Sequence, residues 1–502
     1  MKTKLYLVNP PNPYNMKGFP GSLLSLDLWV RKNVPEVEST IIDEENTHKT
    51  KLEKSLESKL IDSSENLYFG LTSTTATYQD AIETAKVLKK LKPKSTIILG
   101  GHHVDRQEGI ILDYHPEIDL VVTGEGEKAL ESILRGNLNA PGVFSRKKLH
   151  SNFYMFGQRL PEGERLTKEE LNLLTIMEYD ERFQSTQFGE SNLVTARGCP
   201  LDCAFCSVAN KKVTAQDPEI VIEQIAYLVE RNKSLGIKTD IAIQDNFFAQ
   251  SPVRAKEIAK ELISYKERSG NEFKWNMQTR VEQFEDKELV NLLARAGCSA
   301  AYFGIENFDP RLLKFLNKAH NPNKYIEQVG TAIDNCLKIG INPHIDFQVG
   351  IPFEDESSEK INEEAFKKIG TLAEKYDQHP IVFPSLSVVY PGTEFHFMLL
   401  ERGATDNIFE KFTKWERENC EYRKSLYGYF AHGNGGIPIG IGSFYSRLEP
   451  EKDFWFEPSP ITDWSEFRLN KEKLARVKNY VDRLRKIPGI KVHDYSKVKR
   501  EE

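Results

Sequence analysis

Residues 197–206 read Arg-Gly-Cys-Pro-Leu-Asp-Cys-Ala-Phe-Cys, and this stretch sets the fold and chemistry expected of the chain. It holds three of the 6 cysteines: Cys199, Cys203 and Cys206. Thiolates spaced in this way can wrap one face of a metal centre, and they favour iron–sulfur clusters or zinc. A structural zinc site needs a fourth ligand, but the first histidine downstream is His320. The spacing therefore favours a 4Fe–4S cluster with one iron open to a substrate or cofactor.

The residues before this motif alternate short apolar runs with helical patterns. Strands are expected at 5–8, 39–42, 67–71, 96–99 and 120–123, and a helix at 79–91. This alternation predicts a doubly wound, Rossmann-type parallel sheet over residues 1–145, because both faces of each strand are apolar. Ligands of such sheets bind beyond the carboxyl ends of the strands.

The alternation resumes after a polar stretch, residues 146–188, which we interpret as a linker. Strands are expected at 193–195, 241–244, 275–278, 300–304, 344–349 and 385–389, with helices between them. Six β/α units predict a partial parallel (β/α)6 barrel over residues 189–397, with its chemistry at the carboxyl ends of the strands.

The last hundred residues, 398–502, break this pattern and predict a small α+β cap. Aromatic residues between 422 and 456 surround a glycine-rich run, 433–442. We interpret most of them as a small core, and a lid over a substrate pocket is the alternative. Leu474, Val477, Val481 and Leu484 predict an amphipathic helix with a basic, solvated face; docking to an acidic partner is the alternative.

Composition narrows the function classes. The chain has 502 residues, 39% hydrophobic and 28% charged, with a net charge of −6. These values are typical of a globular protein and do not favour a nucleic-acid partner. No apolar run reaches the roughly 20 residues of a membrane span, and the first run, 5–8, is too short for a secretory signal. A cytoplasmic protein is expected, with Cys298 and Cys336 as buried hydrophobic residues.

The cysteine pattern, with an aromatic residue before its last cysteine and Arg-Gly before its first, resembles the radical SAM superfamily. Five later segments resemble that family's barrel: 244–248 the end of its second strand, 303–307 its fourth strand, 317–318 the asparagine-lysine after that strand, and 349–352 and 390–393 the ends of strands five and six. The cysteine motif is highly specific. Each of the other segments is weak alone, but their order along residues 190–395 is informative.

This resemblance implies that Cys199, Cys203 and Cys206 hold a 4Fe–4S cluster whose free iron binds S-adenosylmethionine. Reductive cleavage then gives a 5′-deoxyadenosyl radical, which abstracts a substrate hydrogen. By position, Glu306 suits the ribose hydroxyls and Lys318 suits the methionyl carboxylate. Gln278 and Arg280 are further cofactor-binding candidates, and Phe205 could shield the cluster. Structural salt bridges, strand-end hydrogen bonds and core packing are the alternatives, and no catalytic residue is assigned.

Segments 9–11, 99–102 and 124–127 resemble the cobalamin-binding domain that precedes many such barrels. The usual Asp-x-His-x-x-Gly pattern after the first strand is absent, because the first histidine is His48. Cobalamin would therefore bind without a histidine from residues 9–20 on cobalt. Its nucleotide tail would lie against Thr72, Ser73 and Thr74 and against Gly100 and Gly101, whose alternative role is an ordinary tight turn.

Together, the resemblances predict cobalamin-dependent methylation of an unactivated carbon or phosphorus centre. One alternative is radical chemistry without methyl transfer: cyclisation, carbon–carbon coupling or rearrangement. Another is a non-catalytic iron–sulfur redox or sensor protein. The expected partners are a small-molecule or peptide substrate and an electron donor such as flavodoxin or ferredoxin. Nucleic acid and membrane are not expected, and the identity of the substrate does not follow from the sequence.

Overall fold

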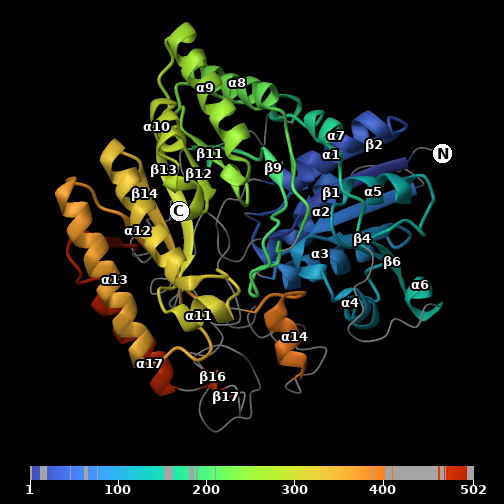
Figure 1. Ribbon diagram of the computed structural model, residues 1–502. Helices are drawn as coiled ribbons and strands as arrows, with labels where there is room; N and C mark the ends of the chain where they lie inside the picture. Colours follow the sequence, from blue (N-terminus) through green and yellow to red (C-terminus); the bar gives the residue numbers. More distant parts are fainter. Residues whose placement is uncertain are drawn as a thin grey trace.

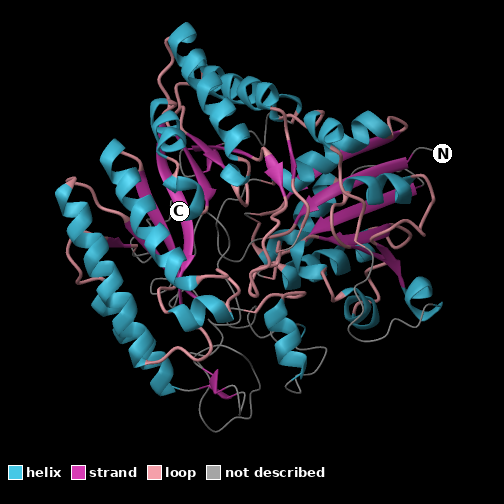
Figure 2. Cartoon of the chain, viewed as in Figure 1, coloured by secondary structure: helices cyan, strands magenta, loops and turns pink. Residues whose placement is uncertain are grey.

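The computed structural model describes residues 3–493, apart from 12–19, 46, 61–65, 76, 152–161, 180–185, 188–189, 210, 388, 402–409, 411–461, 464–467 and 470. The aromatic residues and glycine-rich run expected in the cap, and Cys420, lie outside the described residues. Two parallel sheets stand side by side with their carboxyl edges facing each other (Figure 1). The helices form outer layers around them (Figure 2).

The first sheet has the strand order β2-β1-β3-β4-β5-β6. Its strands are β1 (Thr3–Asn9), β2 (Val37–Asp43), β3 (Asn66–Thr72), β4 (Thr96–Gly100), β5 (Leu120–Val122) and β6 (Val143–Ser145). All neighbours are parallel except β5 and β6. The predicted doubly wound sheet is confirmed, with its strand order reversing between β1 and β3. Ligands of such sheets bind at this reversal.

Helices cover both faces of the first sheet. Leucines of α1 (Gly21–Asn33) and α5 (Glu127–Leu134) pack in one apolar cluster. On the opposite face, a second cluster includes α2 (Leu52–Lys59), α3 (Tyr78–Leu91) and α4 (Glu108–Tyr114). Because both faces are buried under apolar side chains, the only polar part of this sheet that can serve a ligand is its carboxyl edge.

The second sheet has the strand order β18-β15-β14-β13-β12-β11-β8-β7. Its strands are β7 (Thr186–Gln187), β8 (Glu190–Leu193), β11 (Ile241–Ile243), β12 (Trp275–Thr279), β13 (Cys298–Glu306), β14 (Asn342–Val349), β15 (Ile381–Leu386) and β18 (Lys491–Val492). Among these, β7 alone runs antiparallel to its neighbour. The predicted partial barrel is thus confirmed, and β18 extends it by one strand from the end of the chain.

The barrel helices begin and end at local sequence signals. They are α8 (Pro218–Ser234), α9 (Pro252–Ser269), α10 (Lys287–Arg295), α11 (Pro310–Phe315), α12 (Pro322–Ile339), α13 (Glu356–Lys375), α14 (Glu394–Glu401) and α17 (Lys471–Leu484). In α9, α11 and α12 a proline follows an N-cap residue, Ser251, Asp309 or Asn321, whose side chain accepts a backbone N–H. Gly270 and Gly340 end α9 and α12 in the left-handed conformation.

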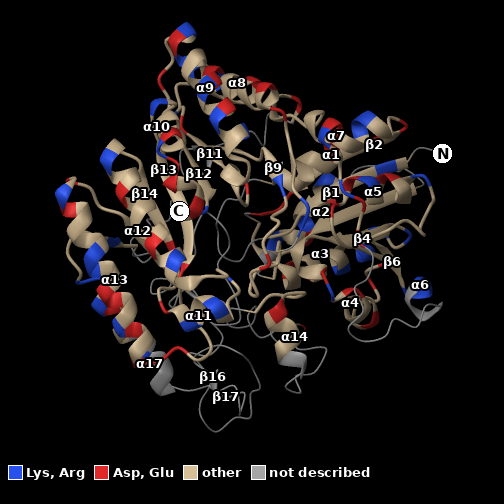
Figure 3. Cartoon of the chain, in the orientation of Figure 1, with Lys and Arg blue, Asp and Glu red and all other residues tan. Residues whose placement is uncertain are grey.

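The inner and outer faces of the barrel sheet differ in polarity. On β14, Ile345, Phe347 and Val349 are buried in the core shared with the helices. His344 and Asp346 alternate with them and therefore face the inside of the barrel. In Figure 3, charged positions of both signs are spread along the outer helices. The barrel interior is thus a polar space, unlike either face of the first sheet.

The sixth expected strand, 385–389, begins earlier in the structure, at Ile381. Pro384 lies inside β15. A proline argues against a strand in a sequence, because it cannot donate a ladder hydrogen bond, and the predicted strand therefore began after it. The proline is tolerated because β18 pairs only with Ile381 and Val382. Beyond Val382, β15 is an edge strand among the described residues.

Several shorter segments connect these parts. The stretch expected as a linker holds α6 (Arg146–Ser151) and α7 (Lys168–Asn172), and its Leu166, Leu171 and Leu174 pack on α1. β9 (Ala196–Arg197) and β10 (Thr214–Ala215) form a hairpin around the cysteine loop, and β16 (Thr462–Asp463) pairs with β17 (Arg468–Leu469). The limits of the four domains stay a prediction. No described helix combines the length and the apolar character of a bilayer span.

Candidate active site between the two sheets

A cavity of about 760 Å³ lies between the facing edges of the two sheets. The first sheet contributes Thr72, Ser73, Thr74, Gly100 and Gly101, the five residues predicted to line a cobalamin tail. From the barrel side come residues at the ends of β8 and β11 and both flanks of the cysteine loop: Asn192, Gln244, Asn246, Arg197, Gly198, Ser207 and Val208. The predicted cobalamin site and the barrel mouth therefore share one space.

The wall from the first sheet is built from backbone and small side chains. Ser73 donates to the carbonyl of Gly100 through its backbone N–H (2.8 Å) and its Oγ (2.9 Å). Gly101 has a φ of +97°, and a Cβ there would stand 2.2 Å from the Ser73 carbonyl oxygen. Only glycine allows this close approach of the ends of β3 and β4. The result is an edge of backbone and small side chains that leaves room for the nucleotide tail of a corrinoid.

The cysteine loop is fixed through its backbone. The N–H of Lys211 donates to the carbonyl of Cys199 (2.7 Å), and that of Cys206 donates to the carbonyl of Cys203 (3.1 Å). The Asn317 side chain donates to the carbonyl of Asp202 (3.1 Å). All three cysteines are half-buried free thiols. The loop is therefore attached to the barrel through Asn317, the residue before Lys318.

Burial and nearby cations shift the pKa values of the thiols in opposite directions. Burial raises the pKa of Cys206 to about 12 and raises that of Cys203, which Lys318 and Arg280 oppose. Bound metal deprotonates such thiols, because the ligand is the thiolate. Among the described residues, no three Cys, His, Asp or Glu side chains converge on a single-ion site. A cubane does not require this, since each thiolate binds a different iron atom.

A buried carboxylate fixes the chain that leads into the cysteine loop. Asp245, after β11, accepts hydrogen bonds from the backbone N–H groups of Thr195 (2.6 Å) and Ala196 (2.8 Å) and from the Thr195 hydroxyl (2.5 Å). Arg254 of α9 donates to the Thr195 hydroxyl as well (3.1 Å). The acidic end of the second barrel strand thus has a structural role here that the sequence alone did not specify.

Glu306 and Lys318 meet inside the barrel mouth. Lys318 Nζ lies 3.2 Å from Glu306 Oε1, and Gln348 Nε2 donates to Glu306 Oε2 at 2.9 Å. A Cβ at Gly304 would stand 2.6 Å from Glu306 Oε1, so this glycine makes room for the ion pair. Burial alone would lower the pKa of Lys318, but Glu306 and Tyr325 outweigh it and raise it. Lys318 is therefore a buried cation at neutral pH.

The backbone at Glu306 is strained. Its φ is +69°, and the register of β13 against β14 shifts between Gly304 and Glu306. A left-handed conformation at a residue with a Cβ costs about 1–3 kcal/mol and persists where the surrounding structure enforces it, often at functional sites. The bulge turns the Glu306 side chain towards Lys318 instead of letting it follow the regular alternation of the strand.

The other predicted cofactor-binding residues surround this pair. Arg280 Nη2 donates to the carbonyl of Lys318 (2.9 Å), and its guanidinium lies 5.5 Å from the ring centroid of Tyr325. Gln278 is half-buried on β12. Phe205 packs against the barrel core. Sequence reasoning missed Tyr325, whose hydroxyl donates to the carbonyl of Gly304 (3.0 Å) and helps to shape the mouth.

Four inward positions of β14 each carry a buried polar atom without a hydrogen-bond partner among the described residues. These atoms are Asn342 Oδ1, His344 Nδ1, Asp346 Oδ1 and Gln348 Oε1. Buried polar atoms are nearly always paired, so a row of unpaired ones indicates a missing ligand or water. Burial and then the Glu306 carboxylate raise the pKa of Asp346 to about 8. These residues fit a polar cofactor such as S-adenosylmethionine, and the alternation of polar residues in 344–348 was the available sequence signal.

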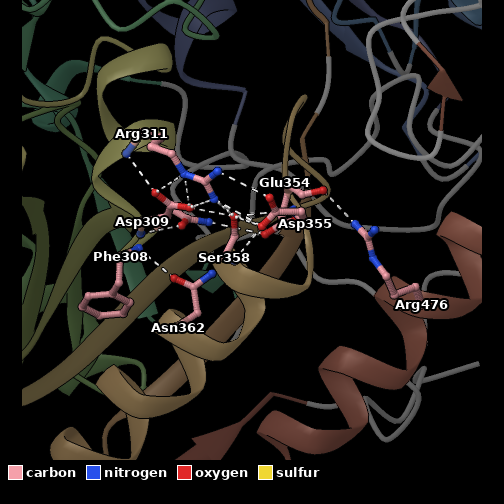
Figure 4. A network of polar contacts seen from close by, with 9 residues as sticks. Phe308, Asp309, Arg311, Glu354, Asp355, Ser358, Asn362 and Arg476 are labelled. Atoms are coloured by element: carbon pink, nitrogen blue, oxygen red, sulfur yellow. Dashed lines mark hydrogen bonds and ion pairs between the residues drawn. The ribbon is translucent and has the colours of Figure 1, made fainter.

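The segment that follows β14 is bound to α17, the last helix among the described residues (Figure 4). Arg476 of α17 donates to the carbonyl of Glu354 (2.8 Å), and Ser358 donates to Asp309 (2.7 Å). Arg476 and Arg483 also form ion pairs with Glu359 of α13, at 2.8 and 2.6 Å. These two arginines of the predicted basic helix are therefore not simply solvated, because their acidic partner is a helix of the same chain.

Each of the two sheets lies in a part of the chain that matches a known protein family. Residues 193–365 match the family model described as the radical SAM superfamily. Residues 36–134 match the B12 binding domain. The radical SAM range includes the cysteine loop and β11 to β14. The B12 binding range includes β3, β4 and β5 of the first sheet.

Several known proteins are similar to this chain in sequence or in fold. The chain is 30% identical to the uncharacterized methyltransferase PH0819 of Pyrococcus horikoshii, over 64% of this chain and 67% of the relative. It is 23% identical to the bacteriochlorophyllide d C-8(2)-methyltransferase of Chlorobaculum tepidum, over 70% and 71%. The fold matches that of the radical S-adenosylmethionine methyltransferase TsrM of Kitasatospora setae, solved with cobalamin and a 4Fe–4S cluster. The TM-score is 0.61 at 17% identity, over 80% of this chain and 75% of that one.

Proposed function

We propose that this chain, which belongs to the radical SAM superfamily and carries an N-terminal B12-binding domain, methylates an unactivated carbon or phosphorus centre. Its two domains imply a 4Fe–4S cluster, S-adenosylmethionine and cobalamin. The observation that carries the proposal is the shared cavity. The edge of the B12-binding domain and the flanks of the cysteine loop line one space of about 760 Å³, so a methyl group need not leave the protein between two cofactors.

Each part of the site has a role in this proposal. The bound cofactors supply a carbon-centred radical and a carrier for the methyl group. Cys199, Cys203 and Cys206 hold the cluster. Lys318 attracts a carboxylate through a charge-assisted hydrogen bond, and Glu306 accepts hydrogen bonds from hydroxyl groups. The polar row on β14 orients the ligand.

The substrate we propose is a small molecule or a peptide, and the electron comes from a reduced flavodoxin or ferredoxin. No described residue supplies the electron, so the reaction needs such a donor. Cyclisation, carbon–carbon coupling or rearrangement without methyl transfer uses the same barrel, and the experiment below separates it from methylation.

The test needs no knowledge of the substrate. The chain is reconstituted anaerobically with iron, sulfide and cobalamin, then reduced and given S-adenosylmethionine with a deuterated methyl group. We expect 5′-deoxyadenosine and transfer of the deuterium label to the corrinoid fraction. Formation of 5′-deoxyadenosine without label on the corrinoid supports the radical chemistry without methyl transfer. Absence of both supports a redox or sensor protein. The variant with all three loop cysteines changed to alanine is the control.

A further inference from the structure

The cysteine loop begins with an arginine that is held by the other domain. Arg197 ends β9, two residues before Cys199. Its Nη1 lies 2.9 Å from Glu127 Oε1 and 3.4 Å from Glu125 Oε2, and its Nη2 donates to Ser25 Oγ at 2.7 Å. Ser25 lies on α1 and Glu127 begins α5. Glu125 and Glu127 lie in the range that matches the B12 binding domain, and Ser25 lies on a helix that packs on the same sheet.

The carboxylate of Glu127 is buried and fully engaged. Only 4% of its side chain is exposed, and Ser25 Oγ donates to its Oε1 at 2.6 Å. Burial alone would raise the pKa of Glu127, but Arg197 and Ser25 outweigh it and lower the pKa below its usual value. The carboxylate is therefore ionised at neutral pH. A buried ion pair adds little net stability, because both ions lose their hydration, but its directed hydrogen bonds can fix the geometry of the groups that it joins.

The far flank of the loop is held more loosely. Lys211 Nζ lies 3.6 Å from Asp105 Oδ2 and 3.6 Å from Glu162 Oε2. Its backbone N–H donates to the carbonyl of Cys199. The loop thus contacts residues outside the barrel at both ends, with short hydrogen bonds at Arg197 and longer ion pairs at Lys211.

We infer that Arg197 and Glu127, with Ser25, form a positioning cluster that fixes the separation of the iron–sulfur loop and the cobalamin site. The inference rests on the proposed function. Transfer between two cofactors depends on their alignment, and a displacement of about 1 Å can cost about 10²-fold in rate. The planar fork of Arg197 suits this role, because it contacts two side chains in fixed directions.

Substitutions in the positioning cluster should separate the formation of 5′-deoxyadenosine from the transfer of the methyl group to the corrinoid. Glu127→Gln keeps the shape of the side chain and removes its negative charge. Arg197→Lys keeps the positive charge and removes the planar guanidinium group. Neither residue binds iron, so both variants should retain the iron–sulfur cluster and form 5′-deoxyadenosine. Label transfer to the corrinoid, divided by 5′-deoxyadenosine formed, should fall at least about tenfold, within the range that small displacements cause. Ser25→Ala should lower the ratio less.

Hydrogen exchange of the cofactor-free protein gives a readout independent of activity. In Glu127→Gln, backbone amides of residues 196–209 should exchange faster than in the wild type, while those of β12 to β14 should not change. The matched control is Lys128→Gln, the next residue on α5, which removes the ion pairs of Lys128 with Glu164 and Glu170 and leaves Arg197 and its partners untouched. It should alter neither the ratio nor the exchange.

Two results would overturn the inference: a wild-type ratio in both Glu127→Gln and Arg197→Lys, or unchanged exchange of residues 196–209 in Glu127→Gln. Failure of the proposed function looks different, because wild-type protein would then transfer no label. In that case the exchange experiment alone decides whether the cluster positions the loop.

Discussion

The facing edges of the two sheets are built from different chemistry. In the first sheet, Ser73, Gly100 and Gly101 present backbone and small side chains, and the two faces behind them are apolar. In the barrel, Glu306 and Lys318 are buried charges, and the inner face of the sheet is polar. One edge can recognise a ligand by shape and the other by charge.

The difference follows from how each sheet is covered. Helices lie on both faces of the first sheet, so apolar side chains must fill both faces and only the edge remains for binding. The second sheet curls, and its helices cover only the outside, so inward side chains are free to be polar. Substitutions at the two edges should therefore weaken ligand binding for different reasons. At the first edge a larger side chain should exclude the ligand, and at the second the ligand should lose a charge or a hydrogen bond.

The largest expected effect is at the cysteines. Changing Cys199, Cys203 and Cys206 together to alanine should remove the iron and the brown colour after anaerobic reconstitution, because thiolates are the metal ligands. Iron analysis and visible absorbance measure this. Cys336→Ala is the control, since Cys336 is fully buried in the barrel core and should not affect iron content. Four irons per chain in the triple variant would refute the assignment.

The shape-based edge should be most sensitive at Gly101. In Gly101→Ala the new Cβ would stand 2.2 Å from the Ser73 carbonyl oxygen, at a φ of +97°. We expect a loss of about 1–3 kcal/mol in the free energy of unfolding and weaker cobalamin binding, measured by urea unfolding and by spectroscopic titration.

Gly109→Ala provides the matched control for this edge. It lies in α4, and nothing stands within 4 Å of its Cβ position. Alanine should raise stability there by about 0.5–1 kcal/mol through helix propensity. Cobalamin binding of Gly101→Ala at the wild-type level would show that the glycine belongs to an ordinary turn.

The charge-based edge should respond to Glu306→Ala and Lys318→Ala. Each should weaken the binding of S-adenosylmethionine by about 1–3 kcal/mol, the usual cost of losing a buried polar partner. Iron content should not change, because neither residue ligates iron. Calorimetry on reconstituted protein measures the affinity, with Lys314→Ala on the exposed side of α11 as the control. Wild-type affinity in both variants would mean that the cofactor lies elsewhere.

The remaining expected effect concerns pH. The pKa of Asp346 is raised from 3.8 to about 8 in the folded protein. A raised carboxyl pKa favours the protonated form on folding, so its contribution to stability is present below about pH 4 and is lost as the pH rises to about 8. Thermal unfolding should show Asp346→Asn gaining on the wild type between pH 5 and pH 9. An equal difference in melting temperature at both pH values would contradict the shift.

The sequence by itself determined the features that depend on local spacing. The alternation of apolar strands and helices predicted both parallel sheets correctly, and the cysteine motif and the glycine pair at 100–101 were recognised from their spacing alone. Such signals are readable because the period of a strand or helix, and the conformational freedom of glycine, involve only neighbouring residues.

Only the tertiary structure decided how distant segments meet. It joined Glu127 to Arg197, brought Tyr325 and Gly304 to the Glu306–Lys318 pair, and placed β18 beside β15. It also showed that Pro384 lies within a strand, where the short partner leaves an unpaired edge. These arrangements depend on contacts between residues far apart in the chain. The sequence around a carboxylate that follows a strand does not indicate whether the carboxylate faces solvent, a ligand or an arginine of another domain.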